Sequence, residues 1–371
     1  MIVMAIDHVR DFIHAGAMRF SPTDLTQTTA AIFLTRFITY YCAPVFVLTA
    51  GMGAFLRLQR CDKGVLSRFL VSRGLWLVIL ELTILRFVVF FQVSPRGSLV
   101  FLMVIWALGL CMILLAALVH LPTRVLAVVS VVVIATHNLL DPIQGAGWLW
   151  AILHRQALFS VAGVSFLVAY PIVPWVAVMS AGYCLGPLFL WEPQRRQRAF
   201  LQIGGALTIA FVVLRAINRY GDPAPWSPQP SALFTVLSFL NTTKYPPSLA
   251  FLLMTLGPAL MLMAWLDRVH LPADHPLIVF GRVPFFFYVT HFALVHLVAI
   301  ALGFVRYGAG RYLLLPPPSM GGPREVFPAD YGFPLWVVYA VWIFVIVALY
   351  PACRWFARLR QRRHDWWLSY L

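Results

Sequence analysis

Residues 245–266 read YPPSLAFLLMTLGPALMLMAWL, a stretch that contains no charged side chain. A helix needs about 20 largely apolar residues to cross the hydrocarbon core of a bilayer, which is roughly 30 Å thick. This stretch therefore predicts a membrane-spanning helix, and most of the remaining chain repeats its pattern.

About ten such spans are predicted along the chain, all in one transmembrane domain that covers residues 1–371. The fold class expected is all-α, a polytopic helical bundle in a membrane. The segment 141–165 contains His154, Arg155, Gln156 and several glycines, and we expect it to be interfacial or re-entrant instead of spanning. The predicted spans are an N-terminal segment, 30–56, 69–92, 98–120, 123–140, 166–190, 199–217, 245–266, 277–304 and 334–356.

The overall composition excludes an ordinary soluble protein. The chain is 61% hydrophobic and 11% charged, with a mean hydropathy of +0.83, whereas soluble domains are about 25% charged. It has too little polar surface to cover a globule, so lipid must solvate most of it. The five cysteines are scattered, which predicts neither a disulfide framework nor a metal site.

The net charge of +15 is explained by membrane topology, and we expect no nucleic-acid partner. All 28 basic residues except Lys63 and Lys244 are arginines, and most stand in short runs between apolar segments, as the positive-inside rule requires. Their distribution predicts that both termini are cytoplasmic and that the longer loops, 218–244 and 306–333, face outward as candidate lids or binding loops. The segment 357–371 is then a basic and aromatic cytoplasmic tail, with Trp366, Trp367 and Tyr370 as an interfacial anchor.

The first fourteen residues, MIVMAIDHVRDFIH, carry the densest group of ionisable side chains. Such groups are costly at membrane depth and mark functional sites. At helical spacing Asp7, Asp11 and His14 share one face, and His8 lies beside Asp11. A histidine next to a carboxylate is suited to general base catalysis; the alternative is a helix end that emerges into water. A helix over these residues rises only about 21 Å, so it either begins inside the membrane or, as we prefer, continues upstream of Met1.

Other polar positions are candidates for binding or for packing. Tyr288 and His291 share a helical face and are predicted to line a cavity, whereas Asn241 and Lys244 either bind a polar acceptor or belong to a helix start at Pro246 and Pro247. Glu81 and Arg86 are expected to be structural, and Gly182 and Gly186 form a G-x-x-x-G packing motif. Five basic residues could bind phosphates, although topology also explains them: Arg57, Arg60, Lys63, Arg68 and Arg73.

Several blocks of sequence stand out together: DHVRDFIH at 7–14, CAPVF at 42–46, RGLW at 73–76, NTTKYPPS at 241–248 and GRVPFFFY at 281–288. Together they resemble the bacterial membrane proteins related to the heparan-alpha-glucosaminide N-acetyltransferase catalytic domain, and the likeness runs nearly end to end. That family belongs to the transmembrane acyltransferases, which take an acyl group from cytoplasmic acyl-CoA and deliver it to an acceptor across the membrane.

The resemblance implies a catalytic histidine at the outer end of the first helix, and His14 is the residue we match to it. In the broader acyltransferase group an arginine lies eleven residues before a histidine of that helix. His8 fits this histidine, and its arginine would precede Met1. The resemblance also implies acetyl-CoA or another acyl-CoA as co-substrate, with no metal.

We therefore expect an acyltransferase of the bacterial inner membrane that acylates an amine or hydroxyl of an extracytoplasmic sugar-like acceptor. Asp7 or Asp11 would orient the base, and either direct attack or an acyl-histidine intermediate is compatible with the residues. The alternative is a proton-coupled transporter or channel that uses the same buried Asp and His residues. The oligomeric state is left open, with a homodimer among the options.

Overall fold

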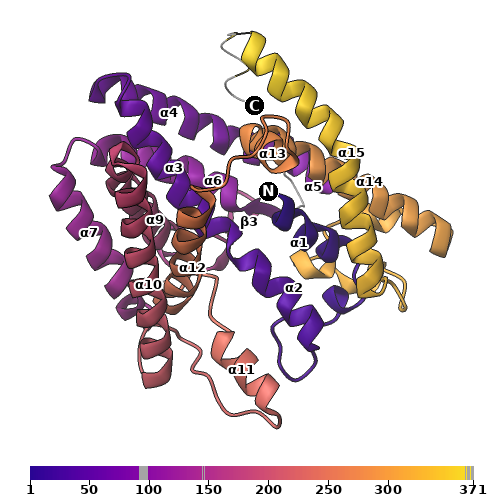
Figure 1. Ribbon diagram of the computed structural model, residues 1–371. Helices are drawn as coiled ribbons and strands as arrows, with labels where there is room; N and C mark the ends of the chain where they lie inside the picture. The colour runs from indigo at the N-terminus through magenta and orange to yellow at the C-terminus, as the bar shows by residue number, and fades with distance from the viewer. Residues whose placement is uncertain (92–98, 144, 146, 364, 366–367, 369–371) are drawn as a thin grey trace. The chain divides into compact units, whose positions relative to one another are not determined.

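The computed structural model describes residues 1–91, 99–143, 145, 147–363, 365 and 368, and most of them are helical (Figure 1). The chain divides into two compact units. Unit 1 contains Met1–Cys42, Ile84–Val93 and His270–Leu371, and unit 2 contains Ala43–Thr83 and Ser94–Val269. Trp366, Trp367 and Tyr370, the predicted membrane anchor, lie outside the described residues.

Within the described part of the chain, seven helical segments are long and apolar enough to cross a membrane, so the chain is a helical membrane protein. The predicted total of about ten is not confirmed. Two of the other predicted spans are short, because α1 (Ile2–Ile13) has 12 residues and α6 (Val104–Leu118) has 15. The remaining predicted span, 69–92, corresponds to α4 (Lys63–Leu80) with its continuation to Phe90. This helix is less apolar, because it carries the charged Arg73, Glu81 and Arg86. The seven segments are Ala30–Leu58, Thr123–Leu140, Ile172–Leu190, Pro193–Ile217, Leu249–Leu266, Pro284–Tyr307 and Leu335–Arg362.

Helix α1 lies at the centre of unit 1. The side chains of Ile6, Val9, Phe12 and Ile13 are completely buried. A polar helix end that emerges into water would leave its charged groups exposed, but Asp7 and Arg10 of this helix are also buried. The neighbours of α1 are α2 (Ala30–Tyr40), α14 (Pro284–Tyr307) and α15 (Leu335–Arg362); α5 (Arg86–Phe90) packs on α14, and α13 (Pro276–Arg282) packs on α15.

The loop between α14 and α15, predicted as a candidate lid or binding loop, covers the C-terminal end of α1. The last carbonyls of a helix have no partner within the helix. Here the Ser319 hydroxyl donates to Asp11 O at 2.7 Å, the Tyr331 hydroxyl to Phe12 O at 3.0 Å and the Phe333 N–H to Ile13 O at 2.7 Å. The loop therefore completes the hydrogen bonding of α1, and its short 3-10 turns are η5 (Arg311–Leu314), η6 (Pro318–Met320) and η7 (Arg324–Val326).

In unit 2, several pairs of helices have backbones that approach closely at glycines. A Cβ added to Gly182 of α9 (Ile172–Leu185) would lie 2.0 Å from Leu48 O of α3 (Cys42–Leu58). Only hydrogen fits at such a contact, so the packing role predicted for the G-x-x-x-G motif is confirmed. Two further pairs of this kind are α4 with α6 and α10 (Pro193–Ile217) with α12 (Leu249–Leu266). Figure 1 shows these pairs, and also α7 (Thr123–Thr136), which packs on α9 without a glycine of its own.

Unit 2 contains a small three-stranded sheet that the predicted all-α fold class did not include. Strands β2 (Ala157–Val161) and β3 (Val164–Val168) form an antiparallel hairpin, and β1 (Leu99–Leu102) pairs with β3 in parallel. Ala162 and Gly163 connect the hairpin with φ angles of 50° and 76°, as a tight two-residue turn requires. With the short α8 (Trp148–Leu153), the hairpin makes 141–165 a non-spanning segment, as predicted, and it moves the start of the span predicted at 166–190 to Ile172.

Helix α12 starts later than the sequence indicated. Its N-cap is Ser248, whose hydroxyl accepts a hydrogen bond from the Phe251 N–H at 3.0 Å. Pro246 and Pro247 therefore precede the helix instead of occupying its first turn. The span predicted at 277–304 is likewise divided, because α14 begins at Pro284 after the separate α13.

Candidate functional site

Two histidines from distant parts of the sequence meet beside α1 in unit 1. His8 Nδ1 lies 2.6 Å from Nε2 of His291, which is completely buried on α14. The second ring nitrogen of His291 lies 2.9 Å from Phe287 O. A carbonyl oxygen can only accept, so Nδ1 of His291 carries a hydrogen and, in the neutral ring, Nε2 is the acceptor. The hydrogen between the two rings then belongs to His8 Nδ1, and the lone pair of a neutral His8 is on its Nε2.

Aromatic side chains hold both imidazoles in place. The Phe292 ring stacks on His8 with centroids 4.0 Å apart, and the Phe287 ring stacks on His291 at 5.1 Å. Tyr288 meets both rings edge-on, at 6.2 Å from His8 and 5.6 Å from His291. The structure thus brings the predicted pair Tyr288 and His291 to one of the two predicted histidines of α1. Contact of any of them with a substrate stays a prediction.

The two carboxylates of α1 form ion pairs with arginines. Asp7 forms ion pairs with Arg10, at 2.8 Å, and with Arg36 of α2, while Asp11 lies 2.6 Å from Arg10. Two negative and two positive groups therefore balance inside unit 1. The Nε and Nη1 atoms of Arg10, which is only 3% exposed, have no hydrogen-bond partner among the described residues. Such buried donors are rare in native proteins and can serve an anionic group.

His14 directly follows α1 and has an extended backbone, with φ −77° and ψ 130°. Its side chain is buried, and within the described part of the chain its Nδ1 has no hydrogen-bond partner. A Cβ at Gly16 would lie 2.7 Å from the His14 ring, so the glycine provides room for the imidazole. The structure therefore places the predicted catalytic residue His14 in a buried position of its own, one helical turn after Arg10 and apart from the contact between His8 and His291.

A third buried histidine of unit 1 has a structural environment. His296 Nε2 lies 2.6 Å from Leu313 O, and its Nδ1 lies 3.3 Å from Val88 O. Its ring also stacks on Phe91 at 4.2 Å. These contacts connect α14 to the following loop and to α5, and they explain the residue without a substrate.

The predicted phosphate-binding residues lie in unit 2 at the junction of α3 and α4. Arg57 and Arg60 line an open groove of about 360 Å³ together with Gly53, Leu56 and Cys61. The Arg57 guanidinium lies 3.7 Å from the centre of the Phe69 ring, and that of Arg73 lies 5.2 Å from it. Lys63 and Arg68 are exposed on α4. Phosphate binding by this group stays a prediction.

Two residues of unit 2 that sequence reasoning missed, the buried Arg215 and the half-buried Asp222, determine the shape of the segment 241–248. The Arg215 guanidinium donates to four backbone carbonyls, including that of Asn241 at 3.0 Å. The Asp222 carboxylate accepts from the backbone and hydroxyl of Thr243, both at 2.9 Å, and from the Ser248 hydroxyl at 2.6 Å. The available signals were Arg215 as the one charged residue of the predicted span 199–217, and one acid in a Pro-rich loop.

Lys244 and Asn241, the predicted acceptor-binding residues, lie on this segment, 241–248, which Arg215 and Asp222 hold by hydrogen bonds. The Lys244 side chain is buried, with Nζ 5.2 Å from the centre of the Tyr245 ring.

Glu81, expected to be structural, accepts a hydrogen bond from the Trp106 N–H at 3.1 Å in the first turn of α6. The unpaired amides at this end of a helix favour negative charge.

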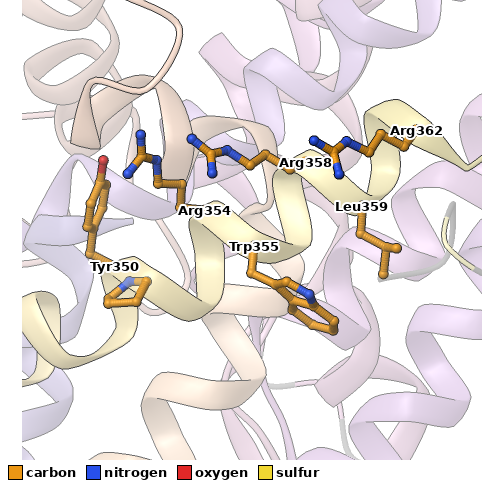
Figure 2. Close-up of a pocket in the computed structure, with 7 residues that line it drawn as sticks. Tyr350, Arg354, Trp355, Arg358, Leu359 and Arg362 are labelled. Atoms are coloured by element: carbon orange, nitrogen blue, oxygen red, sulfur yellow. The ribbon is translucent and has the colours of Figure 1, made fainter.

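The first part of the predicted basic tail, residues 357–362, belongs to α15 of unit 1. Figure 2 shows Arg354, Arg358 and Arg362 on one side of the helix, above Trp355 and Leu359. These residues border a groove of about 440 Å³, and Arg354 also forms an ion pair with Asp274 at 2.7 Å. The spacing of four residues places their charges in one row.

Comparison with known protein families gives a match that covers the N-terminal part of the chain. A family model described as "Heparan-alpha-glucosaminide N-acetyltransferase, catalytic" matches residues 1–217, which is more than half of the chain. No curated protein matches the chain, and neither does a solved structure. The matched range includes His8, His14 and the basic groove at Arg57, whereas His291 lies beyond it.

Proposed function

The chain belongs to the heparan-alpha-glucosaminide N-acetyltransferase catalytic family, and from this premise we propose that it is an acyl-CoA-dependent acyltransferase. In this proposal an acyl group, most simply acetyl, moves from cytoplasmic acyl-CoA to an amine or hydroxyl of an extracytoplasmic sugar-like acceptor. The membrane is the bacterial inner membrane, with both termini in the cytoplasm.

The contact between His8 and His291 is the observation that best supports this function. With its Nδ1 hydrogen donated to His291, neutral His8 has its lone pair on Nε2, where it can remove a proton from the acceptor. The acceptor nitrogen or oxygen then attacks the thioester carbonyl. When the tetrahedral intermediate collapses, the carbon–sulfur bond breaks, and the proton on His8 passes to the departing CoA thiolate.

His291 acts in this proposal as a positioning residue for His8. Its Nε2 accepts the Nδ1 hydrogen of His8 throughout the reaction, the role that a carboxylate has in many His-dependent sites. The arrangement also suits an acyl-histidine intermediate on His8 Nε2, which remains the alternative chemical route. Asp7 and Asp11 form ion pairs with Arg10 and Arg36, and the orientation of the base by one of these carboxylates stays a prediction.

His14 is the second candidate for the base, in accordance with the family resemblance. Its buried Nδ1 without a partner among the described residues and the unpaired Arg10 donors one turn earlier support this assignment. The acyl-CoA phosphates are assigned to Arg57, Arg60, Lys63, Arg68 and Arg73, and the acceptor to Asn241, Lys244 and Tyr288.

The test uses purified protein in nanodiscs with labelled acetyl-CoA and a panel of amino sugars. We expect label transfer by the unaltered chain and a loss of at least about a hundredfold in His8→Ala. The control variant is His120→Gln, which changes an exposed histidine hydrogen-bonded to Ser67. His14→Ala is measured in parallel, and the variant with the lower kcat identifies the base.

The same preparation also tests the rival function. A transporter that relays protons through the Asp and His residues of the first segment, Asp7, His8, Asp11 and His14, would give proton-coupled flux in reconstituted vesicles. Flux without CoA binding or acyl transfer would exclude the acyltransferase.

A further inference from the structure

One exposed face of α15 in unit 1 begins as a stripe of large apolar side chains. Trp336, Ile343, Val347 and Trp355 are each more than half exposed. They follow one another at intervals of seven, four and eight residues, the spacing of a single helical face. Because α15 is one of the segments long and apolar enough to cross a membrane, this apolar stripe is a surface that the helix presents to lipid.

The length of the apolar stripe matches the thickness of a bilayer. From Trp336 to Trp355 the helix rises about 28 Å at 1.5 Å per residue, and the hydrocarbon core of a bilayer measures about 30 Å. Tryptophan is enriched at both membrane–water interfaces, and these two tryptophans stand at the two ends of the stripe. The residues that follow Trp355 therefore reach the level of the lipid headgroups.

Arginines continue the same face beyond the apolar stripe. Arg358 and Arg362 come three and seven residues after Trp355, so they share its side of the helix, and both are exposed. They border the open groove of about 440 Å³ on α15. Figure 2 shows Arg354, Arg358 and Arg362 along one side of this groove and Trp355 with Leu359 along the other. The groove thus has a basic edge and an apolar edge.

The basic edge carries positive charge that no acid of the described residues neutralises. Arg354 forms an ion pair with Asp274 at 2.7 Å, whereas Arg358 and Arg362 form none within the described part of the chain. One helical turn, about 6 Å, separates these two arginines along the axis. Their planar donor forks match the oxygens of a phosphate, so both can bind a single phosphate group.

The occupant of the groove needs an anionic group for the arginines and an apolar part for Trp355. A free phosphate lacks the apolar part, and the ammonium group of a zwitterionic phospholipid offsets the charge of its phosphate. A phospholipid with a net negative charge has both parts, and anionic lipids attract basic segments next to a membrane span. Since the apolar stripe faces lipid, such a molecule reaches the groove from within the bilayer.

We propose that the groove on α15 binds an anionic phospholipid. Arg358 and Arg362 hold its phosphate, and an acyl chain lies against Trp355 and along the apolar stripe towards Val347. This site requires neither acyl transfer nor any residue of unit 2, so it is independent of the proposed function.

The experiment titrates the whole purified chain with lipid and measures the Kd of the first bound lipid by native mass spectrometry. The probes are dioleoyl-phosphatidylglycerol and dioleoyl-phosphatidylcholine, which have the same acyl chains but an anionic and a zwitterionic headgroup respectively. We expect the anionic lipid to bind more tightly. The double variant Arg358→Gln with Arg362→Gln should raise its Kd at least about tenfold and leave the Kd of the zwitterionic lipid unchanged.

A matched control removes the same charge from other span ends. Arg124→Gln with Arg198→Gln changes two exposed arginines, in the first turns of α7 and α10, and should leave the Kd of the anionic lipid unchanged. Arg358→Lys with Arg362→Lys keeps both charges and loses both forks, so it should weaken binding by about threefold. All these side chains are exposed, so the variants should fold.

Several results would overturn the proposal. Equal Kd values for the two lipids would remove the preference for an anionic headgroup. An equal loss in the glutamine variant and in the matched control would assign the arginines to topology alone, and unaltered binding in the lysine variant would exclude a phosphate held by two guanidinium forks. Displacement of the anionic lipid by glycerol 3-phosphate would show that phosphate suffices without acyl chains, and displacement by acetyl-CoA would assign the groove to the acyl donor.

Discussion

His291 shows how a single buried residue can determine the chemistry of another. Its Nδ1 lies against the Phe287 carbonyl, which leaves Nε2 as the acceptor for His8. Without that acceptor, His8 could rotate or adopt the other tautomer, and its Nε2 would no longer be the basic atom. Substitution of His291 should therefore impair catalysis through its effect on His8.

We expect His291→Phe to lower the kcat of acetyl transfer by roughly ten- to a hundredfold, because His8 loses the acceptor that orients it. His291→Gln keeps an acceptor oxygen and should retain more activity than the phenylalanine variant. The KM for acetyl-CoA should change little in either variant. Steady-state kinetics check this, and equal kcat values for Phe, Gln and the unaltered chain would exclude a positioning role.

At the scale of elements, the contact between α3 and α9 depends on a glycine that has a matched control on the same helix. A Cβ at Gly51 would lie 1.9 Å from Met179 O of α9, whereas a Cβ at Gly53 would meet no atom within 4 Å. Gly51→Ala should destabilise the protein by about 1–3 kcal/mol through overpacking. Gly53→Ala should be neutral or stabilising by about 0.5–1 kcal/mol. Thermal unfolding in nanodiscs checks both variants, and equal melting temperatures would contradict the close packing.

The loop that caps α1 offers a second matched pair of variants. Tyr331→Phe removes the hydroxyl that donates to Phe12 O and should cost about 0.5–1.5 kcal/mol. Tyr312→Phe removes a buried hydroxyl that has no hydrogen-bond partner among the described residues, so it should be neutral or stabilising. Melting temperatures of the two variants check the comparison, and a larger loss in Tyr312→Phe would contradict it.

The capping bond also predicts a dependence on pH. Burial, with a further contribution from Tyr312 and Tyr307, raises the pKa of Tyr331. A group whose pKa is raised in the folded state contributes stability below its unfolded pKa, about 10 for tyrosine, and loses it as pH rises further. The unaltered chain should therefore lose more stability than Tyr331→Phe between pH 9 and pH 11, as measured by thermal unfolding. Parallel losses would show that Tyr331 does not titrate with unfolding.

At the scale of the whole molecule, the arginine-rich composition has two explanations, topology and phosphate binding. Both the groove at Arg57 and Arg60 and the row Arg354, Arg358 and Arg362 are basic. Topology requires the charges alone, whereas a CoA site requires particular side chains. The two explanations therefore differ in what one substitution does to the affinity for acetyl-CoA.

We expect Arg57→Ala to raise the KM for acetyl-CoA roughly fivefold, equivalent to about 1 kcal/mol, and to leave kcat nearly unchanged. The effect should shrink at high ionic strength, because salt screens exposed charges. Arg358→Ala on α15 is the control and should not alter the KM. Equal KM values for both variants and the unaltered chain would assign the groove at Arg57 to topology.

The sequence alone predicted the membrane character and most spans of the chain. It also predicted the glycine packing motif and the concentration of ionisable residues in α1. These features depend on local pattern, since length and hydropathy are properties of a continuous segment. The sheet was missed because its strands are short and lie between apolar helices, although Ala162 and Gly163 between two β-forming runs indicate a hairpin. The start of α12 was misplaced because prolines and a Ser N-cap give competing signals.

The sequence by itself determined that this chain is a helical membrane protein with ionisable residues concentrated in its first segment. Only the tertiary structure decided their partners. It paired His8 with His291 and assigned Asp7 and Asp11 to Arg10 and Arg36. The physical reason is that hydropathy is set along the chain, whereas hydrogen bonds and ion pairs depend on distances of about 3 Å between residues far apart in sequence.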